Sequence, residues 1–113
     1  MDLFVLVLNE TEYLQDVLTL FVELGIGGAT VLESTGMGHI VAEDIPIFAG
    51  FKDLLRANRP NNRTILAVVP DGMSDEIVRG IENLIGSLDK AGKGVAFTVP
   101  LGTVYGVGEG FPE

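Results

Sequence analysis

The sequence predicts an α+β fold in which a four-stranded antiparallel sheet carries two helices on one face. Two observations support this prediction. A strand pattern, a helix pattern and a second strand pattern follow one another near the start of the chain, and the same order returns in the second half. The most apolar segment of each half comes first, as expected for central strands that are buried on both faces. At 113 residues the chain has the length of one domain, and we expect a single domain over residues 1–113.

The first unit begins with residues 3–8, an uninterrupted apolar run that is typical of a strand buried on both faces. Asn9 is placed to cap the helix that follows. The apolar positions of this helix recur at helical spacing, at Leu14, Val17, Leu18, Phe21 and Leu24. Gly25 is expected to end the helix, since glycine is common just past helix ends. Residues 29–33 then predict a second strand, which runs out at Gly36-Met37-Gly38.

The second unit repeats this order. Residues 64–69 form another apolar strand pattern, followed by the turn sequence Pro70-Asp71-Gly72. Ser74 is expected to cap the second helix. The apolar stripe of that helix consists of Ile77, Ile81, Leu84, Ile85 and Leu88. Gly80 and Gly86 weaken the helix and indicate close packing against a neighbour. Residues 95–99 predict the last strand.

Two right-handed crossovers in one small sheet give a ferredoxin-like βαββαβ sandwich, with strands 3–8 and 64–69 in the middle. Two helices cover only one face of such a sheet, yet both central strands are apolar on both faces. We therefore expect other copies of the same chain to cover the second face. The alternative is that the long connection between the two units folds back over it.

The charge balance excludes several classes of function. The chain has 7 Lys and Arg against 16 Asp and Glu, a formal net charge of −9, whereas nucleic acid and anionic membranes need a basic face. It has no cysteine and one histidine, His39, so neither a catalytic nor a metal site is expected. The short apolar run at the start predicts neither a signal peptide nor a membrane span, and we expect a cytoplasmic protein without direct membrane insertion.

A long loop, residues 39–62, connects the two units. Within it, residues 49–57 predict a short helix, and residues 58–62 have the composition of a turn. Four of the seven basic residues lie in or beside this loop: Lys52, Arg56, Arg59 and Arg63. Because arginine forks match carboxylate and phosphate oxygens, the cluster indicates an anion site or a docking patch for an acidic partner. The alternative is that these cations pair with the surplus of acids on the same or a neighbouring subunit.

Two glycine turns are candidates for a binding site. Gly36-Met37-Gly38 ends the second strand, and Gly92-Lys93-Gly94 precedes the last one. Glycine lets backbone N–H groups approach a phosphate closely, and Lys93 supplies positive charge. The two turns are therefore placed to form the two lips of a nucleotide cleft.

Taken together, these features resemble the PII-like family of trimeric signalling proteins over nearly the whole chain. The resemblance rests on the order of elements, on Gly28-Ala29-Thr30-Val31, on both glycine turns, and on Phe97 and Val99. It implies a non-enzymatic regulator that forms a homotrimer, with an adenine-nucleotide site between subunits lined by Thr30 and the glycine turns. It also implies that the long loop acts on a target protein such as a transporter or a metabolic enzyme.

The chain departs from the family pattern at the positions that hold phosphates. Nucleotide-binding members have Arg-Gln where this chain has His39-Ile40. Their second turn reads Gly-Asp-Gly-Lys, whereas here Lys93 replaces the acid and Val95 the lysine. Residues 101–110 lack the two arginines of the family's last strand. These departures predict weak binding of ATP, and a smaller anion or a mono- or diphosphate held by Lys93 and the loop arginines.

Two other functions remain open on the same fold. An acylphosphatase-like enzyme needs an arginine-bearing phosphate cradle after the first strand, where this chain has the acidic sequence Asn9-Glu10-Thr11. A trimeric metal-tolerance protein needs more histidine and cysteine ligands than the chain offers. Fold alone does not decide between these functions.

Overall fold

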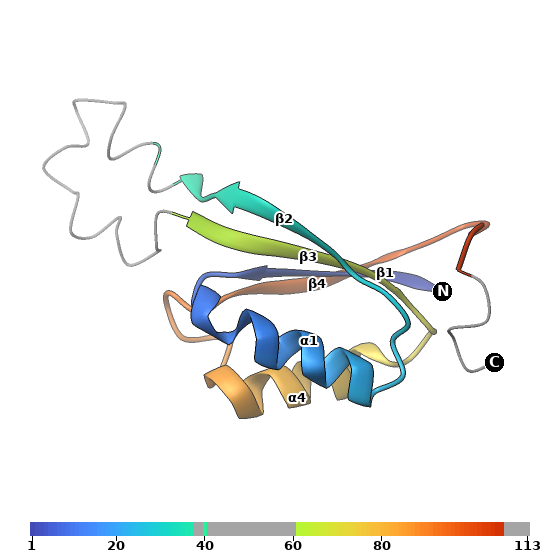
Figure 1. Ribbon diagram of the computed structural model, residues 1–113, viewed down its shortest axis with the longest axis horizontal. Helices are drawn as coiled ribbons and strands as arrows, with labels where there is room; N and C mark the ends of the chain where they lie inside the picture. The colour runs from blue at the N-terminus through green and yellow to red at the C-terminus, as the bar shows by residue number, and fades with distance from the viewer. Residues whose placement is uncertain (38–39, 41–60, 108–113) are drawn as a thin grey trace, which may run out of the picture.

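Figure 1 shows the computed structural model of the chain, which describes residues 1–37, 40 and 61–107. Among these residues, four strands form one antiparallel sheet in the order β2-β3-β1-β4. The strands are β1 (Asp2–Leu8), β2 (Thr30–Thr35), β3 (Asn61–Val69) and β4 (Gly94–Pro100). Helices α1 (Leu14–Glu23) and α4 (Ser74–Ile85) lie side by side on one face, and the 3-10 turn η1 (Thr11–Tyr13) precedes α1. The structure confirms the ferredoxin-like fold, with the two most apolar strands in the middle.

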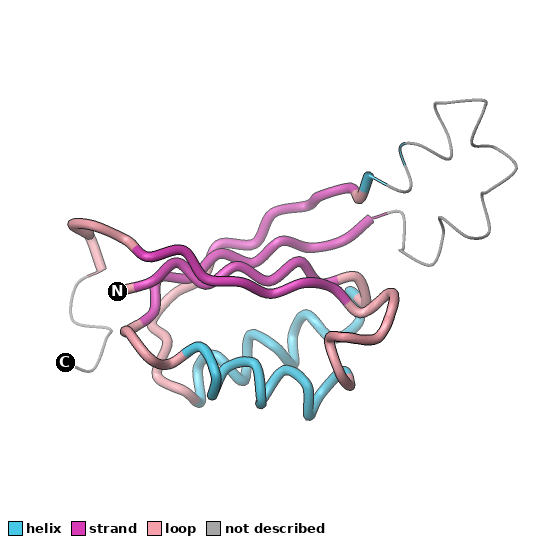
Figure 2. Tube along the Cα trace, turned by 180° about the vertical axis from the view of Figure 1, so that it is seen from behind, coloured by secondary structure: helices cyan, strands magenta, loops and turns pink. Residues whose placement is uncertain are grey.

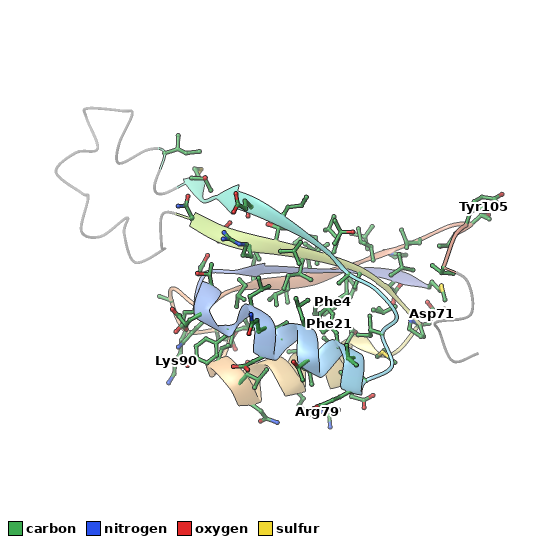
Figure 3. The ribbon with its side chains drawn as sticks, in the orientation of Figure 1. Phe4, Phe21, Asp71, Arg79, Lys90 and Tyr105 are labelled. Atoms are coloured by element: carbon green, nitrogen blue, oxygen red, sulfur yellow. The ribbon has the colours of Figure 1, made fainter. Side chains whose placement is uncertain are left out.

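The core lies between the sheet and the two helices. Alternate residues of β1 and β3 point into it, because side chains of a strand alternate between its faces. The largest fully buried side chains are Phe4, Leu6, Leu8, Ile65, Ile77, Ile81, Val17 and Val69. The rings of Phe4 and Phe21 meet edge to face, with centroids 6.2 Å apart, and join β1 to α1 (Figure 3). This layer accounts for the helical stripes that the sequence predicts.

Both helices begin differently from the sequence prediction. Asn9 does not cap α1; backbone carbonyls form η1 instead, and the N–H of Tyr13 donates to the carbonyl of Glu10. Ser74 is already the first residue of α4, because the N–H of Ile77 donates to the carbonyl of Met73. Neither helix has a side-chain hydrogen bond at its N-cap. Both capping predictions are therefore wrong.

Other boundaries shift by a few residues. β3 starts at Asn61 rather than at residue 64, because its first three residues pair with the last three of β2. α4 ends at Ile85, and Gly86 follows with a φ of +92°, so Gly86 terminates the helix instead of lying within it. Leu88 lies beyond the helix but still packs against the core. The helix predicted over 49–57 lies outside the described residues.

The start of β1 is fastened to the elements beside it. The Met1 amino group lies 2.8 Å from Oδ1 of Asp71, in the turn between β3 and α4, and this hydrogen bond raises the pKa of the amino group. The N–H of Leu101 donates to the carbonyl of Met1 at 3.1 Å. Among the residues described, no helix is both long enough and apolar enough to cross a membrane.

Gly80 lies where α4 packs against α1. A Cβ added to Gly80 would lie 2.7 Å from Cδ1 and 2.8 Å from Cδ2 of Leu20. Ordinary contacts between such atoms are about 3.5–4.0 Å. The close packing that the sequence predicts at Gly80 is confirmed.

We expect Gly80→Ala to change stability in opposite directions in two backgrounds. In the natural chain, crowding against Leu20 outweighs the better helix propensity of alanine, and the free energy of unfolding falls by about 1 kcal/mol. In a Leu20→Ala background the crowding is gone, and the same substitution raises it by about 1 kcal/mol. Urea denaturation of the four proteins measures both values. Equal effects in the two backgrounds would show that Leu20 does not crowd the added methyl group.

Candidate functional site

The sheet face opposite the helices is largely apolar. Figure 2 shows both helices on one side of the sheet and no described helix over the other. The strand register places nine apolar side chains on this second face: Leu3, Val5, Val7, Leu32, Leu66, Val68, Val95, Phe97 and Val99. Phe97 is 47% exposed and Leu32 is 46% exposed, which is high for large apolar side chains. We call these nine residues the open face.

A polar cluster borders the open face at the end of the sheet where β2 ends. The Ser34 hydroxyl donates to Oδ1 of Asn62 and lies 2.8 Å from the Thr64 hydroxyl. Nδ2 of Asn62 donates to Oδ1 of Asn9 at 3.3 Å. Both asparagines are buried, so their amides obtain from one another part of the hydrogen bonding that burial requires.

The first candidate site is a hollow of about 430 Å³ between the end of β2 and the start of β4. Its wall includes Gly36, Gly92 and Gly94, so the structure brings the two predicted glycine turns together. Asn9 and Asn62 of the polar cluster line it as well. We call it the glycine-turn hollow. Met37, also a predicted ligand residue, is 79% exposed and does not line this hollow, and Gly38 lies outside the described residues.

The second glycine turn has a backbone reason for its glycines. Gly92 has a φ of +85° and Gly94 has a φ of +140°. Residues other than glycine rarely adopt these backbone angles. A Cβ on Gly94 would lie 2.1 Å from the carbonyl oxygen of Val7. Gly94 is thus required by the close approach of β4 to β1, whether or not a ligand binds.

Lys93 is already paired with an acid. Its Nζ lies 2.7 Å from Oε1 of Glu10, and the two side chains are 27% and 18% exposed. The N–H of Asn9 donates to the carbonyl of Lys93 at 3.3 Å. The Lys93 side chain runs beside Gly86, and Lys93 is not among the residues that line the glycine-turn hollow. No local sequence pattern indicates Glu10 as the partner of Lys93.

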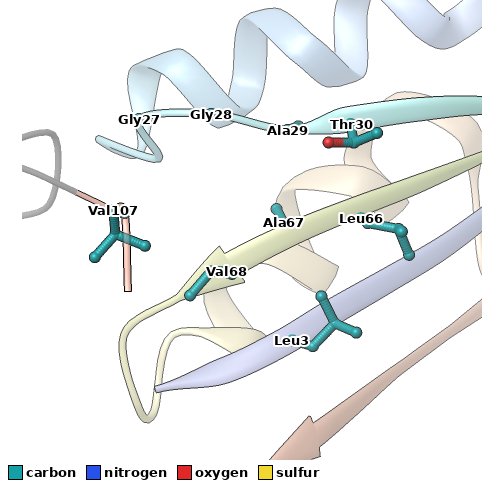
Figure 4. A pocket seen from close by; sticks show the side chains of 10 residues that line it. Leu3, Gly27, Gly28, Ala29, Thr30, Leu66, Ala67, Val68 and Val107 are labelled. Atoms are coloured by element: carbon teal, nitrogen blue, oxygen red, sulfur yellow. The ribbon is translucent and has the colours of Figure 1, made fainter. Parts of the chain in front are cut away.

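Thr30 lies in a different hollow, of about 510 Å³, at the other end of β2 (Figure 4). Its wall is made by residues 27–30, by Leu3, Leu66, Ala67 and Val68 of the central strands, and by Gly106 and Val107. We call it the Thr30 hollow. Thr30 begins β2 and Gly36 follows its end, which separates them by about 20 Å at the rise of an extended strand. Of the predicted ligand residues that line these two hollows, Thr30 therefore lies in one, and Gly36, Gly92 and Gly94 lie in the other.

Arg63 lies apart from both hollows. Its Nη2 is 3.4 Å from Oε1 of Glu33, the residue that faces it on β2. This pair follows the alternative of the sequence analysis, in which the basic residues neutralise acids of the same subunit. The other basic residues of the predicted cluster, Lys52, Arg56 and Arg59, lie outside the described residues.

In the part of the chain that the structure describes, no group of three or more His, Cys, Asp or Glu residues is placed to hold a metal ion. The family model described as Nitrogen regulatory protein P-II matches residues 3–110. A comparison with curated proteins finds no match. The matched range includes Thr30, both glycine turns and the whole long loop.

Proposed function

Because the chain belongs to the nitrogen regulatory protein P-II family, we propose that it is a non-enzymatic signalling protein that binds a small anionic effector between subunits. The effector in this proposal is an adenine nucleotide with one or two phosphates. The protein is a cytoplasmic homotrimer that acts on a target protein, such as a transporter or a metabolic enzyme, through residues 39–62. Lys52, Arg56 and Arg59 are the residues that we propose contact acidic groups of that target.

The separation of Thr30 from Gly36, Gly92 and Gly94, which line a different hollow, is the observation that supports this proposal best. A nucleotide in the glycine-turn hollow of one protomer does not reach Thr30 of the same protomer, about 20 Å away along β2. Both hollows, however, are lined by residues of the open face: Val7 and Val95 in one, Leu3, Leu66 and Val68 in the other. Subunits that pack through their open faces would place the Thr30 hollow of one beside the glycine-turn hollow of the next.

A ring of subunits follows from this arrangement. A contact that joins two different patches is head-to-tail, and head-to-tail contacts end in closed rings when the rotation closes. Three subunits are the number that membership of the family favours. The apolar area of the open face also gives each subunit a reason to associate, since large uncovered apolar patches are rare on monomeric proteins.

We expect titration calorimetry to show binding of AMP and ADP, with ATP bound no more than about tenfold more tightly than ADP. The reason is that the third phosphate meets little positive charge: Glu10 already neutralises Lys93, and residues 101–107 contain no Lys or Arg. Cyclic nucleotides belong in the same series. If none of these compounds gave a heat of binding, the nucleotide would be removed from the proposal.

A matched pair of threonine variants tests the shared site. Thr30→Val should weaken ADP binding by about five- to tenfold, the value of one lost hydrogen bond. Thr19→Val is the control, because Thr19 lies on the exposed side of α1 and its hydroxyl donates to the carbonyl of Gln15. An unchanged affinity in Thr30→Val would place the nucleotide away from Thr30.

A further inference from the structure

We propose that Glu10 is an internal competitor for the anion: its carboxylate occupies Lys93 and has to be displaced before Lys93 can hold a phosphate of the effector. This inference rests on the proposed function, since it concerns the regulation of the same site. It assigns to Glu10 a role in setting which effectors bind, through their charge.

The contact between the two residues supports this role. Nζ of Lys93 lies 2.7 Å from Oε1 of Glu10, and that oxygen is shielded from solvent. Lys93 is the partner that the structure shows for this oxygen, and the contact is an ion pair rather than a well-aligned hydrogen bond. Charge pairs shielded in this way are screened by salt less than fully exposed pairs. An anion that approaches Lys93 therefore meets a cation whose charge is already balanced.

The position of the pair connects it to the candidate site. Lys93 stands between Gly92 and Gly94, both of which line the glycine-turn hollow, and Glu10 follows Asn9, which lines it too. In this proposal the Lys93 side chain rotates away from Glu10 and brings Nζ toward the hollow, whose wall already includes Gly92 and Gly94 on either side of it.

Among the residues that the structure describes, the charges around the hollow leave little attraction for a phosphate while the pair is closed. The residues that line it include one cation, Lys90, and one acid, Asp89, so their formal charges cancel. Lys93 lies between two residues of the wall of the hollow, and Glu10 neutralises it. An effector with two or more negative charges competes with Glu10 better than a weakly charged one. The pair thus favours a diphosphate over a monophosphate and excludes small monoanions.

Glu10→Gln tests this directly, because glutamine keeps the size of the side chain and removes its charge. Calorimetry on the full-length protein at fixed ionic strength uses inorganic pyrophosphate, AMP and ADP as probes. We expect Glu10→Gln to bind pyrophosphate and ADP about tenfold more tightly than the natural chain, the scale of one charge-assisted hydrogen bond. The gain should disappear in the double variant Glu10→Gln/Lys93→Met.

Glu23→Gln is the matched control, since it removes the same charge at the far end of α1, and we expect its affinities to stay within about twofold of the natural chain. If Glu10→Gln bound pyrophosphate and ADP with the same affinities as the natural chain, the competitor role would be overturned and the proposed function would stand. If Glu10→Gln bound these probes and the natural chain did not, the competitor role would be supported. The nucleotide would then be ruled out as the effector of the natural chain. No binding by either protein would overturn both proposals.

Thermal unfolding shows whether Glu10→Gln folds. If it does not, Lys93→Gln provides the reciprocal measurement, because it leaves the charge of Glu10 unbalanced beside the hollow. Lys93→Gln should bind ADP at least tenfold more weakly while its affinity for adenosine, which has no phosphate, stays unchanged. An unchanged ADP affinity would overturn the proposal.

Discussion

Replacing Gly94 with alanine is expected to destabilise the protein by about 3–4 kcal/mol, a large part of the stability of a small domain. The added Cβ would lie 2.1 Å from the carbonyl oxygen of Val7, which is a backbone atom and cannot turn aside as the end of a side chain can. Gly94 pairs with Leu8 at the end of the ladder between β1 and β4. Alanine also resists the φ of +140°. Urea denaturation and the yield of soluble protein measure the effect.

Gly102→Ala is the control for this substitution. No atom lies within 4 Å of the position that its Cβ would take, and its φ is not in the region that favours glycine. We expect its free energy of unfolding to stay within about 0.5 kcal/mol of the natural chain. If Gly94→Ala unfolded at the same urea concentration as Gly102→Ala, the strands would not approach as closely as the structure has them.

The second large effect is expected on assembly. Phe97 lies in the middle of β4, opposite Val5, and its side chain is 47% exposed in the single chain. In the oligomer that we propose, a neighbouring subunit covers it. Phe97→Glu would place a carboxylate in that apolar interface and raise the dissociation constant at least about 1,000-fold, equivalent to about 4 kcal/mol. Size-exclusion chromatography with light scattering should then show monomers at micromolar concentration.

The matched control for assembly is Val22→Glu. Val22 is 74% exposed on α1, in the helix layer away from the open face, so a charge there should leave the oligomer intact. Far-UV circular dichroism checks that both variants keep the fold. An oligomer of unchanged mass in Phe97→Glu would contradict the proposal that the open face is the interface, and a monomeric natural chain would contradict it too.

The sequence predicts the strand order well, for a physical reason. Residues 3–8 and 64–69 are apolar on both faces, and only central strands can bury both faces. The start of β3 is harder to predict, because Asn61 and Asn62 have the composition of a turn. They lie in the strand because β2 supplies their hydrogen-bonding partners, and the amide of Asn62 finds a further partner in Asn9. Such partners come from tertiary structure and leave no local pattern.

Some features of the candidate site can be predicted from the sequence, and others cannot. Gly36 and Gly92 line one hollow. This agrees with the prediction that the two glycine turns form the two sides of one cleft. The ion pair between Glu10 and Lys93 joins residues from opposite ends of the chain, and neither residue type indicates the other. The separation of Thr30 from Gly36 follows from the strand that the sequence predicts between them, whereas the hollow in which each residue lies needs the structure.

The polar cluster of Ser34, Asn62, Thr64 and Asn9 affects how temperature acts on an assembly of this chain. These groups bond to one another within a single protomer, so much of their dehydration has already occurred when the protomer folds. Association would then draw most of its free energy from hydrocarbon leaving water, a driving force that weakens on cooling. A diluted sample should consequently hold its subunits together less firmly in the cold than at room temperature.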